Sequence, residues 1–305
     1  MRRRDFLKLQ AAAALSIGTA SLAGFPARLL AAPNPDVIVV KASPAAATRA
    51  AVEALGGMAA FVKPGQKVII KPNMSFASNV DSAANTHPEV VRELLVMCAE
   101  AGAASVRVLD HAFQSGMRSL EYSGILDACN SVVGGVCHNL TQERHYRESA
   151  LAGAQEMKSN AFMTDVLEAD VIIAAPVAKS HSSTGVSLSL KGQMGLVRDR
   201  NVMHSRYSLD TAIVDLCFQV KPTLSVIDAT RVLSTNGPGG PGKVLTPGEV
   251  IASADPVAAD AAAVASYEWY GRKIRPRQVA HIAQAHARGL GRMDIENLTV
   301  RRLSL

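Results

Sequence analysis

The chain has 305 residues with 32 Lys or Arg and 26 Asp or Glu, giving a formal net charge of +6 at pH 7. Its length suits one large domain or two lobes with a shared core. No internal repeat or long low-complexity tract is present, which excludes repeat arrays and fibrous chains. Aromatic residues make up only 4% of the chain, and alanine is abundant, a composition that favours helices packed closely on a sheet.

The first 32 residues have the pattern of an export signal. Arg3 and Arg4 precede Asp5-Phe6-Leu7-Lys8, the order of a twin-arginine signal, which a receptor reads. Residues 9–27 carry no charge but are too weakly apolar for a convincing membrane span, and Ala31-Ala32 offers small residues for cleavage. We therefore expect a periplasmic or otherwise exported protein whose precursor meets the twin-arginine machinery, with no stable membrane span after cleavage. The alternative is a basic amphipathic helix that stays on the protein.

Most of the positive charge belongs to this segment. Residues 1–32 carry a net +4, so that cleavage leaves +2 on the mature chain. The remaining basic run, at 272–277, is typical of a solvated helix end. The sequence therefore predicts no nucleic-acid partner.

Short Val- and Ile-rich segments alternate along the mature chain with Ala-rich helical ones, a pattern typical of βαβ units. The pattern predicts strands at 37–41, 67–71, 105–110, 170–175, 224–228 and 250–254, and helices at 88–101, 208–219 and 255–270. Residues 116–153 fit neither pattern and suggest either an excursion of the chain or a small inserted subdomain. We expect residues 33–305 to form a single α/β domain with a mainly parallel sheet and helices on both faces.

The four cysteines, Cys98, Cys129, Cys137 and Cys217, include no C-x-x-C pair, so the spacing typical of zinc and iron–sulfur sites is missing. Cys98 and Cys217 lie in apolar helical patterns and are predicted to be buried thiols. An oxidising compartment would allow Cys129 and Cys137 to form a disulfide.

Polar residues follow several of the predicted strands. Lys71 and Asn73 end one strand, Asp110 and His111 the next, and Asp228 a later one. The strand at 170–175 leads into Pro-Val-Ala-Lys-Ser-His at 176–181. Because ligands of open α/β sheets bind beyond the carboxyl ends of the strands, these side chains are predicted to share one rim.

These junctions are also motifs of a known family. The motifs lie at 68–73, 86–91, 168–173, 176–181 and 189–195, followed by His204, Asp228, 237–242 and 254–260. Together they resemble the family called domain of unknown function 362, over essentially the whole mature chain. The resemblance implies the fold but little chemistry. Some relatives carry ferredoxin-like cysteine runs for iron–sulfur clusters, and because this sequence lacks them we do not expect that cofactor.

Lysines stand at three of these motif positions. Lys71, Lys179 and Lys191 indicate a cationic pocket for a carboxylate or phosphate, helped by backbone N–H groups of the turn at 192–195. Asn73 and Gln193 are candidate ligand-binding amides, although the family more often has asparagine directly after the last lysine. The alternative is that the lysines simply solvate loops.

Histidines give two further hypotheses. His181 and His204 are the candidate acid–base residues, because imidazole titrates near neutral pH. A divalent metal is a possible cofactor, and its candidate ligands are His87, Asp110, His111 and Asp228. His87 precedes Pro88, so its alternative role is to cap the following helix.

The run from Thr235 to Lys243 is rich in glycine and proline and suggests either a lid over the pocket or a flexible connector. Taken together, these residues predict an exported enzyme or cofactor-dependent protein of unknown reaction that binds a small anionic molecule. The rival interpretation is a non-catalytic periplasmic ligand-binding or scaffolding module with the same pocket.

Overall fold

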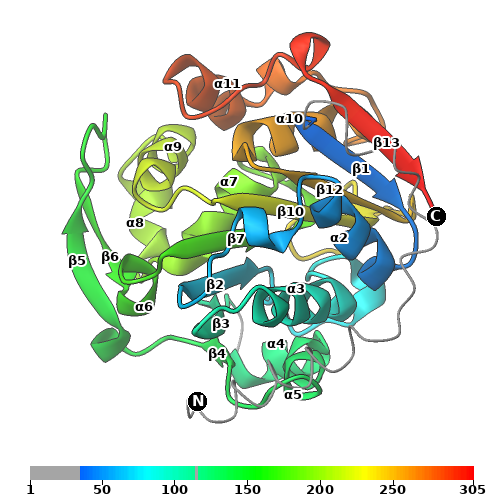
Figure 1. The fold of residues 1–305 in the computed structure, drawn as a ribbon. Coiled ribbons are helices and arrows are strands. Elements are labelled where there is room, and N and C mark those ends of the chain that lie inside the picture. The colour runs from blue at the N-terminus through cyan, green and yellow to red at the C-terminus, as the bar shows by residue number, and fades with distance from the viewer. Residues whose placement is uncertain (1–34, 114–115) are drawn as a thin grey trace.

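The computed structural model describes residues 35–113 and 116–305, so the proposed export signal lies outside the described residues. One large mixed sheet runs through the centre, with helices on both of its faces (Figure 1). The predicted α/β class is therefore confirmed.

The strands that carry the polar junctions are parallel neighbours. The sheet order is β13-β1-β12-β10-β7-β2-β3-β4. The parallel part consists of β10 (Leu224–Leu233), β7 (Val171–Ala175), β2 (Lys67–Pro72), β3 (Ser105–Asp110) and β4 (Cys137–Asn139). The other strands are β12 (Glu249–Ser253), antiparallel to β10 and to β1 (Val37–Lys41), and β13 (Val300–Ser304), parallel to β1.

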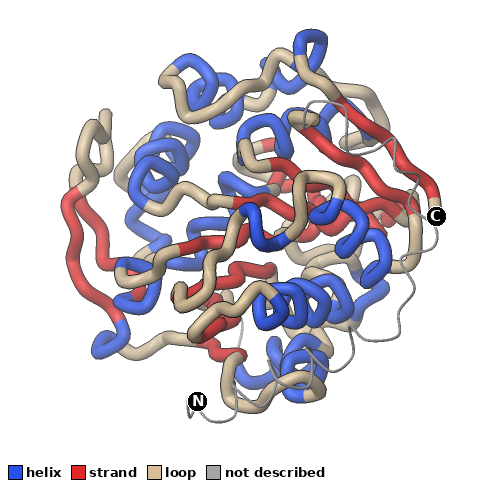
Figure 2. Tube along the Cα trace, viewed as in Figure 1, coloured by secondary structure: helices blue, strands red, loops and turns tan. Residues whose placement is uncertain are grey.

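Alternating strand residues build two cores, one on each face of the sheet. Val37 and Val39 point into one core, and Ile38 and Val40 into the other. The first core is covered by α7 (Ser189–Gly192), α8 (Arg200–Ser205), α9 (Leu209–Gln219), α10 (Pro256–Ser266) and α11 (Ala280–Ala287). The second is covered by α2 (Pro44–Glu53), α3 (Pro88–Glu100), α4 (Gly116–Tyr122) and α5 (Ile125–Asn130). The result is a three-layer arrangement (Figure 2).

Helix ends follow from local chemistry. The His87 ring accepts a hydrogen bond from the backbone N–H of Glu89 at 3.1 Å, so His87 caps α3. Asp255 caps α10 in the same way. The predicted helix at 255–270 is too long: α10 ends at Ser266, because Tyr267 is extended and the buried Trp269 ring donates to the Val264 carbonyl at 3.1 Å.

One other sequence prediction needs correction, and one open alternative is decided. Strand β10 continues five residues beyond Asp228, since it pairs there with β8 (Val177–His181) and buries its polar side chains with hydrogen bonds. Residues 116–153 form no separate subdomain. Their first part, α4 and α5, leads into the edge strand β4, and the rest leads into a two-stranded sheet of β5 (Tyr146–Ala150) and β6 (Ser159–Met163).

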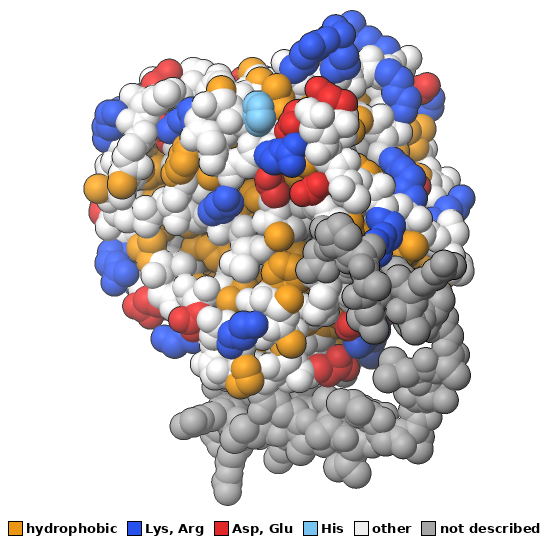
Figure 3. Space-filling model, turned by 45° about the horizontal axis from the view of Figure 1, so that its top comes forward, with side chains coloured by type: hydrophobic (Ala, Val, Ile, Leu, Met, Phe, Trp, Pro, Cys, Tyr) orange, Lys and Arg blue, Asp and Glu red, His pale blue; other side chains and the backbone are white. Residues whose placement is uncertain are grey.

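The four cysteines are buried free thiols, so Cys129 and Cys137 are not joined in this structure. Over the residues that the structure describes, no helix has the length and apolar character needed to cross a membrane. On the face drawn in Figure 3, Lys and Arg side chains are interspersed with Asp and Glu rather than gathered in one stripe.

Candidate functional site

A cavity of about 390 Å³ opens at the carboxyl ends of the parallel strands. Lysines lie at its base: Lys71 and Lys179 are each 2% exposed, and Lys191 is 9% exposed. Exposed residues surround its mouth, among them Phe113 and His204. The cavity therefore lies where the carboxyl ends of the predicted strands indicated. Lys71 is the last residue but one of β2, and Lys179 lies in β8, which continues β7 beyond Pro176.

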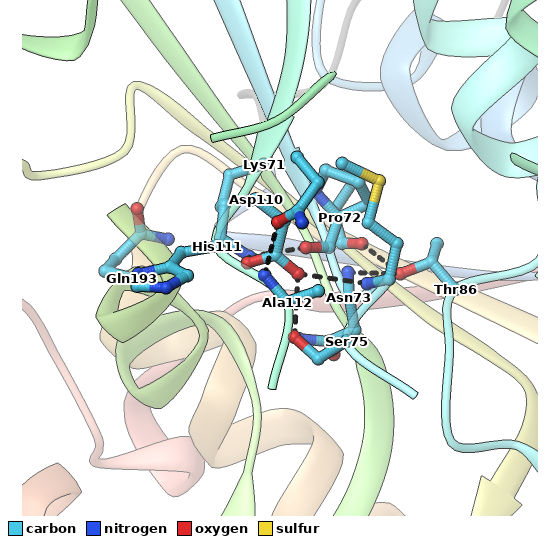
Figure 4. Close-up of polar contacts among 12 residues, drawn as sticks. Lys71, Pro72, Asn73, Ser75, Thr86, Asp110, His111, Ala112 and Gln193 are labelled. Atoms are coloured by element: carbon cyan, nitrogen blue, oxygen red, sulfur yellow. Dashed lines mark hydrogen bonds and ion pairs between the residues drawn. The ribbon is translucent and has the colours of Figure 1, made fainter. Parts of the chain in front are cut away.

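A buried ion pair joins the ends of β2 and β3. Lys71 Nζ lies 3.0 Å from Asp110 Oδ1, and both side chains are 1% exposed. Asp110 Oδ2 accepts hydrogen bonds from Ser75 Oγ at 2.9 Å and from the Met74 backbone at 3.1 Å (Figure 4). Burial raises the pKa of Asp110, but the Lys71 and Arg200 charges and the Met74 hydrogen bond outweigh burial and hold this pKa below its usual value. Asp110 is therefore ionised.

Gly195 lets a second segment approach this pair closely. A Cβ atom at Gly195 would lie 2.0 Å from Asp110 Oδ1 and 2.6 Å from Lys71 Cε. The Gly195 carbonyl also accepts a hydrogen bond from the His111 backbone at 2.9 Å. The motif at 189–195 is therefore seated against the ion pair, and a side chain at this glycine would displace it.

Within residues 35–113 and 116–305, no carboxylate contacts the Lys179 amine directly. Its Nζ donates to the Ala84 carbonyl at 2.6 Å and lies 4.9 Å from the centre of the Phe76 ring. Burial, together with the charges of Lys191 and Lys71, lowers the pKa of Lys179 to about 7. This amine is therefore poised to gain or lose a proton near neutral pH.

Lys191 is held in the wall by α7. A buried carboxylate, Asp260, accepts hydrogen bonds from the Ser189 and Leu190 backbones at 2.7 and 3.0 Å and fixes the start of this short helix. Burial and the charges of Arg200 and Lys71 lower the pKa of Lys191 to about 8. The cavity thus holds two amines whose charge depends on pH near neutrality.

The two candidate acid–base histidines are brought together. The rings of His181 and His204 stack with centroids 6.4 Å apart. Burial and the Lys191 and Lys179 charges lower the pKa of His181 to about 3, so its ring is neutral at pH 7. His181 Nδ1 accepts a hydrogen bond from the Ser183 backbone at 3.2 Å, which places the ring proton on Nε2. His181 lines the cavity and can therefore donate a hydrogen bond from Nε2.

Of the two amide residues predicted to bind the ligand, only one lines the cavity. Asn73 lines the cavity, and its Oδ1 accepts a hydrogen bond from the Val177 backbone at 3.0 Å. Gln193 is fully buried outside the cavity wall, and its Nε2 donates to the Ser189 carbonyl at 3.0 Å. The amide at this position therefore braces α7 instead of facing the cavity.

The four candidate metal ligands do not gather around one point. Asp228 accepts hydrogen bonds from the His87 backbone at 2.7 Å and from Thr230 Oγ1 at 2.6 Å, and it pairs with Arg231 at 2.7 Å. Asp110 lies with Lys71, while His111 Nδ1 contacts the Val197 carbonyl at 3.2 Å. In the described parts of the chain, no three His, Cys, Asp or Glu side chains could hold a metal together. The sequence could not reveal these competing partners.

Sequence reasoning missed Arg200, Phe76 and Phe113, all of which line the cavity. Phe76 lies three residues after Asn73, and Phe113 lies three residues after Asp110. A search of the three residues that follow each polar strand end would therefore have found both phenylalanines. Arg200 begins α8 and carries no such signal. The loop at 235–243 contributes Pro238 and Gly239 to the wall, so it packs on the cavity.

The chain is similar to several known proteins. A thylakoid-associated protein of Synechocystis sp., sll1697, is 28% identical over 225 residues, covering 70% of this chain and 67% of the relative. The lactate racemase apoprotein from Thermoanaerobacterium thermosaccharolyticum matches 73% of this chain with a TM-score of 0.45 and 14% identity. A Thermotoga maritima protein matches 61% with a TM-score of 0.36 and 12% identity. The chain covers 55% and 51%, about half, of these two solved structures.

The residues that build the cavity lie within a stretch that matches a family model. The family model for the domain of unknown function DUF362 matches residues 68–265, more than half of the chain. That match includes β3, β8, α7 and all of β2 but Lys67, the elements that supply the three lysines and the ion pair. The chain therefore belongs to the DUF362 family.

Proposed function

We propose that this chain is an exported enzyme that binds a small carboxylate- or phosphate-bearing molecule in the cavity and exchanges a proton with it. The observation that carries the proposal is the charge of the cavity wall. Lys71, Lys179, Lys191 and Arg200 line it, and among the described residues Asp110 is its only carboxylate. Since Lys71 is paired with Asp110, the other cations form an uncompensated positive centre. An anionic ligand would compensate it.

The two amines with lowered pKa support catalysis over a purely binding or scaffolding role. General acid–base groups work best when their pKa lies near the working pH, and the pKa values of Lys179 and Lys191 are about 7 and about 8. Lys179 and His181 are alternate residues of β8 and line the same cavity. In this proposal the lysines take up a proton as the anion binds and can pass that proton to the ligand, while neutral His181 donates a hydrogen bond.

Export is the sequence-based part of the proposal. The Arg3-Arg4 pattern precedes a weakly apolar run, and twin-arginine export carries folded proteins. A folded protein can leave the cytoplasm with a ligand already bound.

Isothermal titration of the purified chain with sodium sulfate, whose own charge is constant near pH 8, tests anion binding and proton uptake by the protein together. At pH 8, a bound anion should raise the pKa of the Lys179 and Lys191 amines, so the protein should take up protons on binding. This uptake is measured as a binding enthalpy that changes with the ionisation enthalpy of the buffer. Lys179→Met and Lys191→Met should each weaken binding and reduce the uptake. Lys67→Met is the matched control, because Lys67 is exposed at the opposite end of the same strand as Lys71.

The outcomes separate the two parts of the proposal. Failure to bind any of sulfate, phosphate or a small carboxylate such as acetate would overturn the anion site. Binding with no proton uptake would favour the non-catalytic module.

A further inference from the structure

An aromatic pair stands at the mouth of the cationic cavity. Phe76 follows β2 and Phe113 follows β3, and their ring centroids are 6.1 Å apart with the planes inclined at 40°. Both side chains line the cavity. The cavity therefore has two chemically different ends: buried lysines at its base and aromatic rings at its mouth.

The two rings differ in how they are covered. The Lys179 ammonium lies 4.9 Å from the Phe76 ring centre, and a Cβ atom at Gly239 would lie 2.8 Å from Phe76 Cε1. Protein atoms therefore already pack closely against Phe76. Phe113 is 71% exposed. An apolar ring of this size left in water beside a polar cavity is a surface that a ligand would stabilise by covering it.

The volume also exceeds what a bare anion needs. A water molecule takes about 30 Å³ of liquid volume, and a phosphate or carboxylate group is only a few times larger. The cavity holds about 390 Å³, within the range of sites that enclose small organic molecules. Room is left between the lysines and the mouth for the body of a ligand.

We propose that the ligand is an anion with a planar ring, whose charged group reaches Lys179 and Lys191 while the ring packs on Phe113. This inference rests on the proposed anion site and adds the class of molecule that fills it. A flat aromatic ring gains from offset or tilted packing on Phe113 beyond the area that it buries. A saturated ring of similar size buries comparable area without that gain.

Three probes test the inference: phenyl phosphate, cyclohexyl phosphate and inorganic phosphate, each titrated calorimetrically into the purified chain. Phenyl phosphate should bind about 2- to 10-fold more tightly than cyclohexyl phosphate, the ratio expected for an aromatic pair. Phe113→Leu keeps an apolar side chain but removes the ring, and should bring that ratio close to 1. Because Phe113 is exposed, this variant should fold normally.

Phe218→Leu serves as the control, since Phe218 is a 40% exposed phenylalanine of α9 that packs on Arg288, and it should leave the ratio unchanged. Equal binding of the two esters to the unaltered chain would overturn the planar-ring inference while leaving the anion site standing. A preference for phenyl phosphate that survives Phe113→Leu would overturn the assignment to Phe113. The same result is expected if Phe113 contacts a protein partner and not the ligand. Failure of all three probes to bind would refute the anion site and the inference with it.

Discussion

Replacing Gly195 by alanine tests whether the motif at 189–195 is built around the Lys71–Asp110 pair. The new methyl carbon would lie 2.0 Å from Asp110 Oδ1 and 2.6 Å from Lys71 Cε. Real Cβ atoms essentially never approach a neighbour closer than 3.0 Å, so atoms must move apart by about 1 Å. The neighbours are a buried ion pair, whose 3.0 Å separation would have to change.

The cost follows from these contacts. Overpacking a buried site by one methyl group costs about 1–3 kcal/mol, and breaking a buried ion pair costs about 3–5 kcal/mol. We expect partial disruption and a loss of about 2–4 kcal/mol in the free energy of unfolding. The entropy gained by replacing a glycine, about 0.4–1 kcal/mol, offsets only part of the loss. For a chain of this size the melting temperature should fall by roughly 5–15 °C.

Gly192→Ala is the matched control in the same motif. Gly192 has φ −58°, a helical conformation that alanine adopts, and its Cβ would find its nearest neighbour, Pro176 Cβ, at an ordinary 3.7 Å. This variant should be neutral or gain up to about 1 kcal/mol from helix propensity. Thermal unfolding followed by circular dichroism compares the two. A Gly195→Ala protein as stable as Gly192→Ala would refute the close packing of this glycine on the ion pair.

Three further predictions concern the charges of the pocket and the export signal. Sulfate, whose own charge is constant in this range, should bind most tightly at pH 6 and progressively less as the pH rises through about 7 and 8, where Lys179 and Lys191 lose their protons; calorimetry showing pH-independent affinity would contradict the lowered pKa values. Lys179→Ala and His181→Ala should each fold normally yet lose phosphate affinity, with a non-additive loss in the double variant; unchanged affinity in both single variants would indicate a solvated loop. Replacing Arg3 and Arg4 with lysine should trap the precursor in the cytoplasm, as seen by fractionation and immunoblotting, and normal export would reject the twin-arginine signal.

The location of the pocket was predictable because it depends on topology. Apolar runs identified the parallel strands, and polar residues at their carboxyl ends had to share a rim. Lys71, Asp110 and Lys179 meet on this account, although 39 residues separate Lys71 from Asp110 along the chain and 69 separate Asp110 from Lys179. Which charged side chains have protein partners and which do not was not predictable, because hydrogen bonds between distant segments leave no periodic pattern in the sequence.

Asp228 and Gln193 show why residue type alone was insufficient. Each has the chemistry of a ligand-binding side chain and lies in a motif of the family. The structure gives Asp228 four protein contacts, from His87, Thr230 and Arg231, so its oxygens are already used. Gln193 faces α7 because the short helix there turns its side chain back toward the Ser189 carbonyl. A side chain that satisfies the backbone and one that awaits a ligand look the same until the fold is known.

The argument for a ligand is that some buried charged side chains have an ion-pair partner in the protein while Lys179 has none in contact among the described residues. Two buried carboxylates of this fold are matched by arginines: Asp228 pairs with Arg231, and Asp215 pairs with Arg288 and accepts three backbone hydrogen bonds. Lys179 differs from them, because a carbonyl and an aromatic ring hold its amine and no carboxylate of the described residues contacts it. Keeping the amine charged there costs folding energy, and the lowered pKa is the measure of that cost. An anion bound beside the Lys179 amine would stabilise its charged form. The burial that lowers the stability of the protein without a ligand would therefore strengthen the binding of an anion.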